Sequence, residues 1–305
     1  MRPQPEQART DTLNLPLLRE QGVGLCLRRE DLLFPQLSGN KYRKLKYNLE
    51  EARRLGYRKL VTFGGAYSNH IHATAAAGRL YGFETLGLIR GDELPGRPLN
   101  PTLEDASRAG MQLVFLSRAD YALRGEPHFQ KTCLERYGPA YLLPEGGTNE
   151  LAIRGCAEIL QPGDQAFDLL CCPVGTGGTL AGLVRASEPR QRVLGYPALK
   201  AAGLGSQLAR FIPGENWALS EHSHLGGYAK VPARLVAFIN GFLEQTGIPL
   251  DPVYTGKMMY AILEDVRSGR IAPGSSVLAI HTGGLQGIRG MNLQLRKKNL
   301  PLLQL

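Results

Sequence analysis

Residues 167–183, FDLLCCPVGTGGTLAGL, combine an apolar strand, a glycine-rich turn and the start of a helix. An apolar run that ends in such a turn is typical of a buried strand in a parallel sheet. Glycines allow backbone N–H groups to converge, and a helix N-terminus carries a partial positive charge, so the turn is suited to a phosphate group. It matches neither the P-loop nor the G-x-G-x-x-G dinucleotide pattern. A plain structural turn is the alternative to phosphate binding.

The same alternation of strand and helix recurs along most of the chain. It predicts parallel sheets that are covered by helices on both faces. Such sheets bind ligands in the loops beyond the carboxyl ends of their strands, so we expect the functional site there. Strands are expected at residues 59–63, 85–91, 111–117, 140–147, 167–174, 192–199 and 275–284, and helices at 45–55, 70–80, 103–109, 127–137, 149–160, 179 onward, 203–211 and 258–269.

Length and composition are typical of a soluble globular protein with two lobes or one large lobe. The chain has 305 residues, of which 43% are hydrophobic and 21% charged. A single core usually divides at about 250–300 residues. The longest apolar runs are too short to span a membrane. The first residues lack the apolar segment of a secretory signal, so we expect a cytoplasmic protein.

The formal net charge of +9 is spread along the chain. No nucleic-acid motif accompanies it, so we expect neither nucleic acid nor a membrane as a partner. The basic tail, residues 295–305, is interpreted as a solvated end rather than a binding arm. The five cysteines have no metal-like spacing, so no metal site is expected, and Cys171 and Cys172 are interpreted as buried strand residues.

A basic segment at residues 37–49, LSGNKYRKLKYNL, follows a Ser-Gly-Asn turn. It places four cations within six positions: Lys41, Arg43, Lys44 and Lys46. If Ser38 or Asn40 caps a helix, Lys41 lies in the first turn, where the helix dipole disfavours a cation. These residues alone leave two interpretations open. The segment is a solvated basic face, or it holds a lysine of lowered pKa that forms a Schiff base.

Six segments, taken together and in their order, resemble the pyridoxal-phosphate (PLP) enzymes related to 1-aminocyclopropane-1-carboxylate (ACC) deaminase and D-cysteine desulfhydrase. They read REDLLFPQLSGNKYRKLKYNL, FGGAYSNHIHATAAAG, PEGGTN, VGTGGTLAGL, LDPVYTGKMMYAILEDV and IHTGG. The resemblance implies an α/β protein of PLP fold type II, the tryptophan synthase β-like fold, with parallel sheets flanked by helices. It also implies that a small lobe at 43–154 is inserted in a large lobe made of 1–42 and 155–305.

The resemblance further implies which residues bind the cofactor. Lys41 is similar to the lysine that holds PLP covalently, and Lys44, on the same expected helix face, to a lysine that contacts its phosphate. In this interpretation Arg43 and Lys46 are ordinary surface charges. Asn69 matches the residue that hydrogen-bonds the 3′-oxygen of the ring. The residues implied to bind the cofactor are Lys41, Lys44, Asn69, Gly175, Thr176, Gly177, Gly178, Thr179, Thr255 and Thr282.

The substrate is implied to bind beside the cofactor. Ser68, Asn69 and His70 match a site for its carboxylate at the expected start of a helix, where free N–H groups attract anions. Tyr228 and Tyr254 match two tyrosines near the substrate. The residues implied to take part in catalysis are Lys41, Ser68, Tyr228 and Tyr254.

Two positions are implied to separate the chemistries of the family. ACC deaminases have Glu in place of Thr255 and Leu in place of Thr282, whereas this chain has the threonine pair of the desulfhydrases. A Glu that faces the pyridine nitrogen keeps it protonated, and a Thr hydroxyl leaves the ring neutral. A neutral ring suits the loss of an α-proton and a β-thiolate better than the opening of a cyclopropane ring.

We therefore expect a PLP-dependent lyase or deaminase that acts on a small amino acid. The preferred hypothesis is α,β-elimination as in D-cysteine desulfhydrase, in which Lys41 removes the α-proton and a 2-oxo acid, ammonia and sulfide are released. ACC deaminase is the alternative enzyme, and a PLP-carrying amino-acid sensor without turnover is the alternative of another class. The resemblance implies a homodimer. His72 and Tyr67 stand where desulfhydrases more often have Arg and Gln. We expect these differences to affect which substrate is accepted, and not which cofactor is bound.

Overall fold

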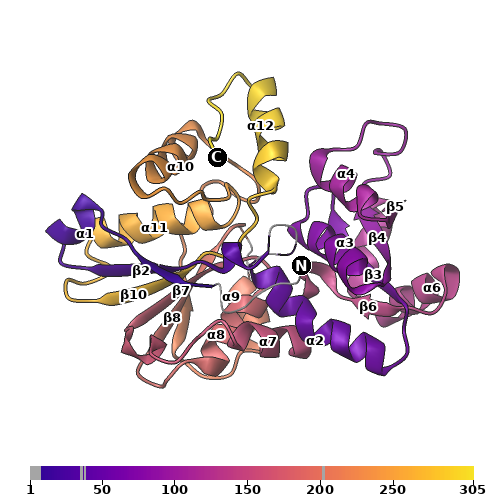
Figure 1. Ribbon diagram of the computed structural model, residues 1–305, viewed down its shortest axis with the longest axis horizontal. Helices are drawn as coiled ribbons and strands as arrows, with labels where there is room; N and C mark the ends of the chain where they lie inside the picture. Colours follow the sequence, from indigo (N-terminus) through magenta and orange to yellow (C-terminus); the bar gives the residue numbers. More distant parts are fainter. Residues whose placement is uncertain (1–7, 35–36, 38, 201–202) are drawn as a thin grey trace.

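The structure is a computed structural model that describes residues 8–34, 37, 39–200 and 203–305. Within these ranges the chain forms a six-stranded sheet and a four-stranded sheet, and helices cover both faces of each (Figure 1). This arrangement confirms the predicted α/β class. No helix of the described ranges is both long enough and apolar enough to cross a bilayer.

The larger sheet is formed by strands from both ends of the chain. In spatial order they are β1 (Thr10–Thr12), β2 (Gly24–Arg28), β10 (Ser276–Ile280), β7 (Leu169–Val174), β8 (Arg192–Pro197) and β9 (Trp217–Leu219). Strand β1 is antiparallel to β2, and the other neighbours are parallel. One face is covered by α1 (Pro16–Glu20), α10 (Ala233–Thr246), α11 (Thr255–Arg267) and α12 (Gly287–Lys297). The other is covered by α7 (Glu150–Ala157), α8 (Gly178–Ala186) and α9 (Leu204–Ala209).

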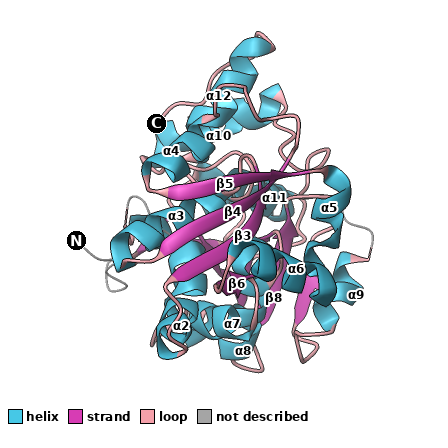
Figure 2. Ribbon diagram, turned by 90° about the vertical axis from the view of Figure 1, so that its right-hand side faces the viewer, coloured by secondary structure: helices cyan, strands magenta, loops and turns pink. Residues whose placement is uncertain are grey.

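The smaller sheet is formed by one continuous part of the chain. Its parallel strands, seen stacked in Figure 2, are β5 (Met111–Leu116), β4 (Glu84–Arg90), β3 (Lys59–Gly65) and β6 (Tyr141–Leu143). Helices α2 (Asn40–Arg54), α3 (Asn69–Tyr81) and α4 (Pro101–Arg108) cover one face, and α5 (Arg118–Ala122) and α6 (Pro127–Tyr137) cover the other. Short 3-10 helices lie at Glu30–Leu32, Leu123–Gly125, Glu145–Gly147 and Asp164–Ala166.

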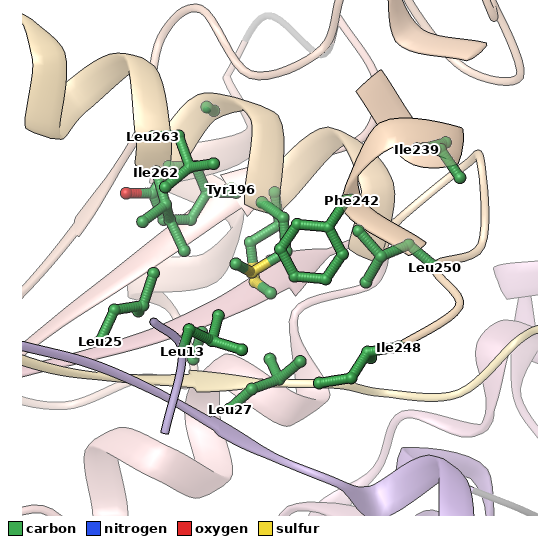
Figure 3. Packing of buried hydrophobic residues seen from close by; sticks show 14 of the residues in the cluster. Leu13, Leu25, Leu27, Tyr196, Ile239, Phe242, Ile248, Leu250, Ile262 and Leu263 are labelled. Atoms are coloured by element: carbon green, nitrogen blue, oxygen red, sulfur yellow. The ribbon is translucent and has the colours of Figure 1, made fainter. Parts of the chain in front are cut away.

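Apolar side chains on both faces of the strands hold the layers together. In β3, Leu60 packs toward α2 and α3, while Val61 and Phe63 pack toward α5 and α6. Figure 3 shows part of the largest cluster, which includes strand residues such as Leu27 and helix residues such as Phe242. Each such side chain contributes about 1.5–3 kcal/mol when it is fully buried. Cys171 and Cys172 are fully buried in β7, which confirms their prediction as packing residues.

The prediction that residues 295–305 are a solvated end is confirmed for the basic side chains, which are exposed, and wrong for two of the leucines. Leu295 and Leu303 are 2% and 5% exposed and belong to the core of the larger sheet. The side chain of Asn292 exchanges two hydrogen bonds with the backbone of Leu303, both of 2.9 Å. These two leucines therefore hold the end of the chain against the core, and its basic side chains face the solvent.

The predicted lobe boundaries fall inside two helices. Position 42/43 lies in α2 and position 154/155 in α7, and these two helices pack against each other. The main chain of α2 passes so close to α7 that a Cβ on Gly155 would collide with the carbonyl oxygen of Arg43. The boundaries remain predictions, and this helix pair connects the two sheets.

Candidate active site

A cavity of about 680 Å³ lies where carboxyl ends of strands from both sheets come together. The end of β4 and the segments after β3, β5 and β6 reach it from the smaller sheet, and loops after β7, β8 and β10 reach it from the larger. Open parallel sheets bind their ligands at this edge. Most of the predicted site residues line the cavity, and the two that do not are Gly178 and Thr255.

The start of helix α2 is pressed against the loop after β10. Gly39 is the N-cap, with a φ of 64°, and a Cβ here would collide with the carbonyl oxygen of Thr282. Asn40 donates from Nδ2 to Thr179 Oγ1 over 2.8 Å. Asn40 is therefore the first helical residue and not the predicted cap, and Ser38, the other predicted cap, lies outside the described residues.

Lys41, in the first turn of α2, lines the cavity. Burial, together with the positive charge of Lys44, lowers the pKa of Lys41 to about 7. No described residue accepts a hydrogen bond from its amine. Near neutral pH much of this amine is unprotonated, which is the form that attacks a carbonyl carbon or accepts a proton.

Lys44 is held differently, by three acceptors. Its Nζ donates to the carbonyl of Gly146, to Thr148 Oγ1 and to Thr176 Oγ1 over 3.1, 2.9 and 3.2 Å. Burial lowers the pKa of Lys44, but three acceptors match the three protons of an ammonium group and favour the charged form. Because Thr176 belongs to the glycine-rich loop, a fixed positive charge stands beside that loop.

The glycine-rich loop, residues 175–179, connects β7 to α8. Gly177 is the N-cap of α8, with a φ of 81°, and no side chain caps this helix. The first N–H groups of the helix are therefore open to a ligand, and the helix dipole favours an anion. A Cβ on Gly178 would lie 2.8 Å from Thr148 Oγ1 and 3.2 Å from Lys44 Cε, so the glycine lets Lys44 approach.

The prediction that Arg43 and Lys46 are surface charges is wrong for Arg43. The Arg43 side chain is 3% exposed and donates from Nε and Nη2 to the carboxylate of Glu30 over 2.9 and 2.8 Å. Lys46 is half-buried and pairs with Glu158 at 2.7 Å. Each of the four cations thus has a defined partner or cavity, which rules out a solvated basic face.

The start of helix α3 forms another wall of the cavity. Ser68 caps the helix, because its Oγ accepts from the N–H groups of His70 and Ile71 over 3.2 and 3.3 Å. Asn69 accepts at Oδ1 from Gln286 Nε2 over 2.9 Å. No described residue binds its Nδ2, so this amide group is available to a ligand.

His70 lines the cavity as a neutral, buried ring. Burial, together with Lys41, lowers the pKa of His70 well below its usual value, so the imidazole is neutral. Thr62 Oγ1 donates to the carbonyl of Leu143 over 3.1 Å and therefore accepts from His70 Nε2–H over 2.8 Å. The other nitrogen, Nδ1, is buried without a partner. The ring thus gives no support to binding a carboxylate, and a role for His70 there stays a prediction.

Tyr254 and Tyr228 meet edge to face at the cavity, with ring centroids 6.2 Å apart and an interplanar angle of 68°. Burial, with Tyr228 nearby, raises the pKa of Tyr254 well above its usual value. Its phenol therefore stays protonated and can donate. A Cβ on Gly175 would lie 3.2 Å from the Tyr254 ring, so this tyrosine stands directly beside the glycine-rich loop.

Of the predicted threonine pair, Thr282 lines the cavity and Thr255 does not. Thr255 is fully buried, and its Oγ1 donates to Asp251 Oδ2 over 2.7 Å. Asp251 also accepts from the N–H groups of Tyr254 and Thr255, over 2.9 and 2.7 Å. The Thr255 hydroxyl is thus engaged at the start of α11, and its role at a ring nitrogen stays a prediction.

Sequence reasoning assigned no role to a group of charged residues on the wall formed by the smaller sheet. Glu145 accepts from Arg124 Nε over 2.5 Å and from the Tyr121 hydroxyl over 2.6 Å. Arg90 stacks on Tyr121, with its Cζ 5.6 Å from the ring centroid. Arg90 could have been found, because it ends an expected strand at the edge where ligands bind. No sequence signal locates Arg124.

The residues of the cavity fit pyridoxal phosphate. The unpartnered amine of Lys41 suits covalent attachment to an aldehyde. The open N–H groups of α8, with Lys44 beside them, suit a phosphate, and the Asn69 amide suits a ring oxygen. The volume of about 680 Å³ is in the usual range for ligand pockets.

The known proteins to which this chain is similar are pyridoxal-phosphate dependent enzymes. The family of pyridoxal-phosphate dependent enzymes matches residues 4–283. The chain is 30% identical to the mitochondrial bifunctional D-cysteine desulfhydrase/ACC deaminase of Arabidopsis thaliana, over 90% of this chain and 75% of that protein.

Two solved structures share the fold. A crystal structure of an ACC deaminase homologue is similar with a TM-score of 0.81 and 25% identity, over 95% of this chain and 93% of that chain. The O-acetylserine dependent cystathionine β-synthase of Helicobacter pylori is similar with a TM-score of 0.65 and 15% identity, over 91% and 92% of the two chains. The architecture is thus that of PLP fold type II.

Proposed function

We propose that this chain, which belongs to the family of pyridoxal-phosphate dependent enzymes, eliminates the β-substituent of a small amino acid. The products are a 2-oxo acid, ammonia and the leaving group, which is sulfide when the substrate is D-cysteine. The observation that carries the proposal is the Lys41 amine, with a pKa of about 7, in a cavity it shares with an uncapped helix N-terminus and a protonated tyrosine.

The side chains of the cavity support this chemistry. When bound, PLP supplies an electron-withdrawing ring that stabilises negative charge on the α-carbon of an amino acid. Lys41 would hold it covalently, and Lys44 with the N-terminus of α8 would hold its phosphate. Ser68 and Asn69 bind the substrate carboxylate at the start of α3 and so orient the α-carbon. The free amine of Lys41 then takes the α-proton, because its lowered pKa leaves it unprotonated.

The tyrosine pair supports the departure of the leaving group. A thiolate leaves more easily when a proton reaches it, and the Tyr254 phenol keeps its proton because burial raises its pKa. The Tyr228 ring lies edge to face with that of Tyr254 and limits its orientation. In the proposed reaction Tyr254 donates the proton to the leaving group, and Tyr228 holds the Tyr254 ring in position.

ACC deaminase is the second candidate function. It is favoured by the Arabidopsis relative, whose name includes both activities, and by the structural similarity to an ACC deaminase homologue. Thr282 in the cavity wall favours elimination, because ACC deaminases have Leu there. A sensor without turnover is disfavoured because the family consists of enzymes.

A panel of D- and L-amino acids together with ACC, assayed for 2-oxo acid, tests the proposal. Pyruvate and sulfide from D-cysteine are expected, and 2-oxobutyrate from ACC would select the second candidate. Lys41→Ala should abolish turnover and covalent cofactor. Lys46→Ala, on the same helix but paired with Glu158, should retain both. Covalent PLP in the Lys41→Ala protein would show that the lysine is wrongly assigned.

A homodimer in the cytoplasm completes the proposal. The resemblance to the desulfhydrases supports the dimer, and the free thiols of the five cysteines support a reducing compartment such as the cytoplasm. Light scattering coupled to gel filtration should give about twice the chain mass of 33.3 kDa. A mass equal to one chain would remove the dimer and leave the proposed reaction intact.

A further inference from the structure

The wall of the cavity formed by the smaller sheet carries a positive charge that no described residue balances. The carboxylate of Glu145 is already bound by Arg124 and Tyr121, at 2.5 and 2.6 Å. Arg90, on the same wall, has no carboxylate partner and no side-chain hydrogen bond among the described residues. Its guanidinium group stacks on the ring of Tyr121.

The surroundings of Arg90 leave its hydrogen-bonding groups free for a ligand. It is the last residue of β4, at the edge of the sheet where ligands bind. Its Cζ lies 5.6 Å from the centroid of the Tyr121 ring, and stacking of this kind restrains a guanidinium group while its N–H groups stay free. Gly65 lies next to the guanidinium group of Arg90 and leaves it uncovered. A Cβ at this glycine would lie 3.6 Å from Arg90 Nη2.

The other anionic groups expected in the cavity have positive partners of their own. A phosphate at residues 175–179 faces Lys44 and the N-terminus of α8. A substrate carboxylate at Ser68 has the positive end of the α3 dipole and the free Nδ2 group of Asn69 as partners, while Ser68 Oγ caps two N–H groups of that helix. Arg90 is needed for neither, so its charge remains for the part of the substrate that points toward the smaller sheet.

We propose that Arg90 binds a negatively charged group on the side chain of the substrate. The preferred substrates are then amino acids whose β-substituent is anionic, such as a sulfate or phosphate ester. A guanidinium group binds such oxyanions through two parallel N–H donors. This inference rests on the proposed elimination and names its substrate class.

The reaction with such a substrate balances without a further reagent. For serine O-sulfate, the α-proton passes to Lys41, the Cβ–O bond breaks, and its electron pair leaves with the sulfate. The released enamine takes up one water to give pyruvate and ammonium. No oxidant or reductant is consumed.

The test compares serine O-sulfate with β-chloroalanine, each as both enantiomers, in the holoenzyme. The two compounds differ in whether the β-substituent is charged. In Arg90→Gln, kcat/KM for the sulfate should fall about tenfold or more relative to the chloride, because a charge-assisted hydrogen-bond pair is lost. Arg90→Lys should retain part of the preference. Arg97→Gln removes a charge from the following loop, outside the cavity, and should leave the ratio unchanged.

Two outcomes overturn the inference. Unchanged kcat/KM for both compounds in Arg90→Gln means that Arg90 is only solvated. An equal loss for both compounds means that it binds the α-carboxylate. If the wild-type holoenzyme forms pyruvate from neither compound, the proposed elimination fails instead.

A binding measurement tests Arg90 independently of turnover. Calorimetry of the holoenzyme should show that aspartate binds more tightly than alanine, and that high salt reduces the difference. Arg90→Gln should remove the difference. Equal affinity of the wild-type holoenzyme for the two amino acids would contradict the inference even if both elimination substrates react.

Discussion

Three lysines near the start of helix α2 differ in the pKa and the bonding of their amines, because the surroundings of each amine differ. Lys44 has three acceptors, and Lys46 has the carboxylate of Glu158. Lys41 has none, so burial is not offset and its pKa falls to about 7. For Lys46, burial is outweighed by Glu158, and the pKa is raised. The same residue type therefore gives a reagent at one position and a fixed charge at another.

Trace acetylation of the apoprotein should reveal this difference. An amine reacts only when it is unprotonated, so labelling of Lys41 should be half-maximal near pH 7 and reach a plateau above it. Lys46 should label only above pH 10.5, because its pKa is raised from that value. Peptide mass spectrometry after labelling from pH 5 to 11 measures both. A half-maximum near 10 for Lys41 would contradict the proposed role of burial.

For single residues, the sequence could predict which side chains belong to the site, but only the structure shows what surrounds each of them. The resemblance pointed to Lys41 and Lys44, and both line one cavity. It could not indicate that Arg43 is buried, because its partner Glu30 belongs to another element. It also could not show that Thr255 bonds Asp251, since that depends on how α11 begins.

At the scale of elements, periodicity predicted the elements with simple patterns. Helix α6 has the predicted bounds, and β3 and α3 differ by one or two residues from prediction. Strand β2 was missed because its apolar run is only three residues long and ends at the buried Arg28, which pairs with Asp164 at 2.7 Å. Helix α12 was missed because Gly290 and a basic end obscure its buried face. Both depend on contacts with distant parts of the chain.

The loop after β9 depends on one buried amine of helix α11. Lys257 Nζ donates to the carbonyls of Ala198, His224 and Gly227 over 3.3, 2.9 and 2.7 Å. Burial lowers the pKa of Lys257 to about 8, so the group is protonated below that pH. Because Gly227 precedes Tyr228, these bonds fix the position of that tyrosine at the cavity.

Lys257→Met should loosen this loop. Three carbonyls lose the ammonium donor. Those of His224 and Gly227 keep a backbone N–H donor, and a carbonyl left unsatisfied costs about 1–3 kcal/mol. We expect a lower Tm, faster hydrogen exchange at residues 224–228 and a lower kcat. Lys230→Met, on the exposed side of the same loop, is the control and should match wild type. Unchanged exchange in Lys257→Met would mean that other contacts hold the loop.

Gly178→Ala should weaken cofactor binding without unfolding the protein. The new Cβ would lie 2.8 Å from Thr148 Oγ1 and 3.2 Å from Lys44 Cε, so it pushes that lysine from the loop. Loss of about 1.4 kcal/mol would weaken PLP affinity tenfold, and a loss of at least that size is expected in a titration of apoprotein. Gly241→Ala, in the interior of α10 with space around it, should keep wild-type affinity.

At the scale of the whole molecule, helix α12 connects the larger sheet to the smaller one. Arg289 in α12 pairs with Asp105 in α4, and Gln286 just before α12 bonds Asn69 over 2.9 Å. His72 Nε2 lies 3.4 Å from the same Asp105 carboxylate. The helix layers of the two sheets are thus in contact at α12 and α4 as well as at α2 and α7, so the width of the cavity depends on both connections.

The Asp105 and Arg289 pair should affect substrate binding more than stability. Its side chains are 22% and 50% exposed, and a pair of this kind contributes about 0–1 kcal/mol, so Tm should change little in Asp105→Asn or Arg289→Gln. KM should rise about two- to fivefold in each, because a looser contact widens the cavity. The double variant should be no worse than either single variant, since both remove the same contact. Additive effects on KM would show that the two residues act separately.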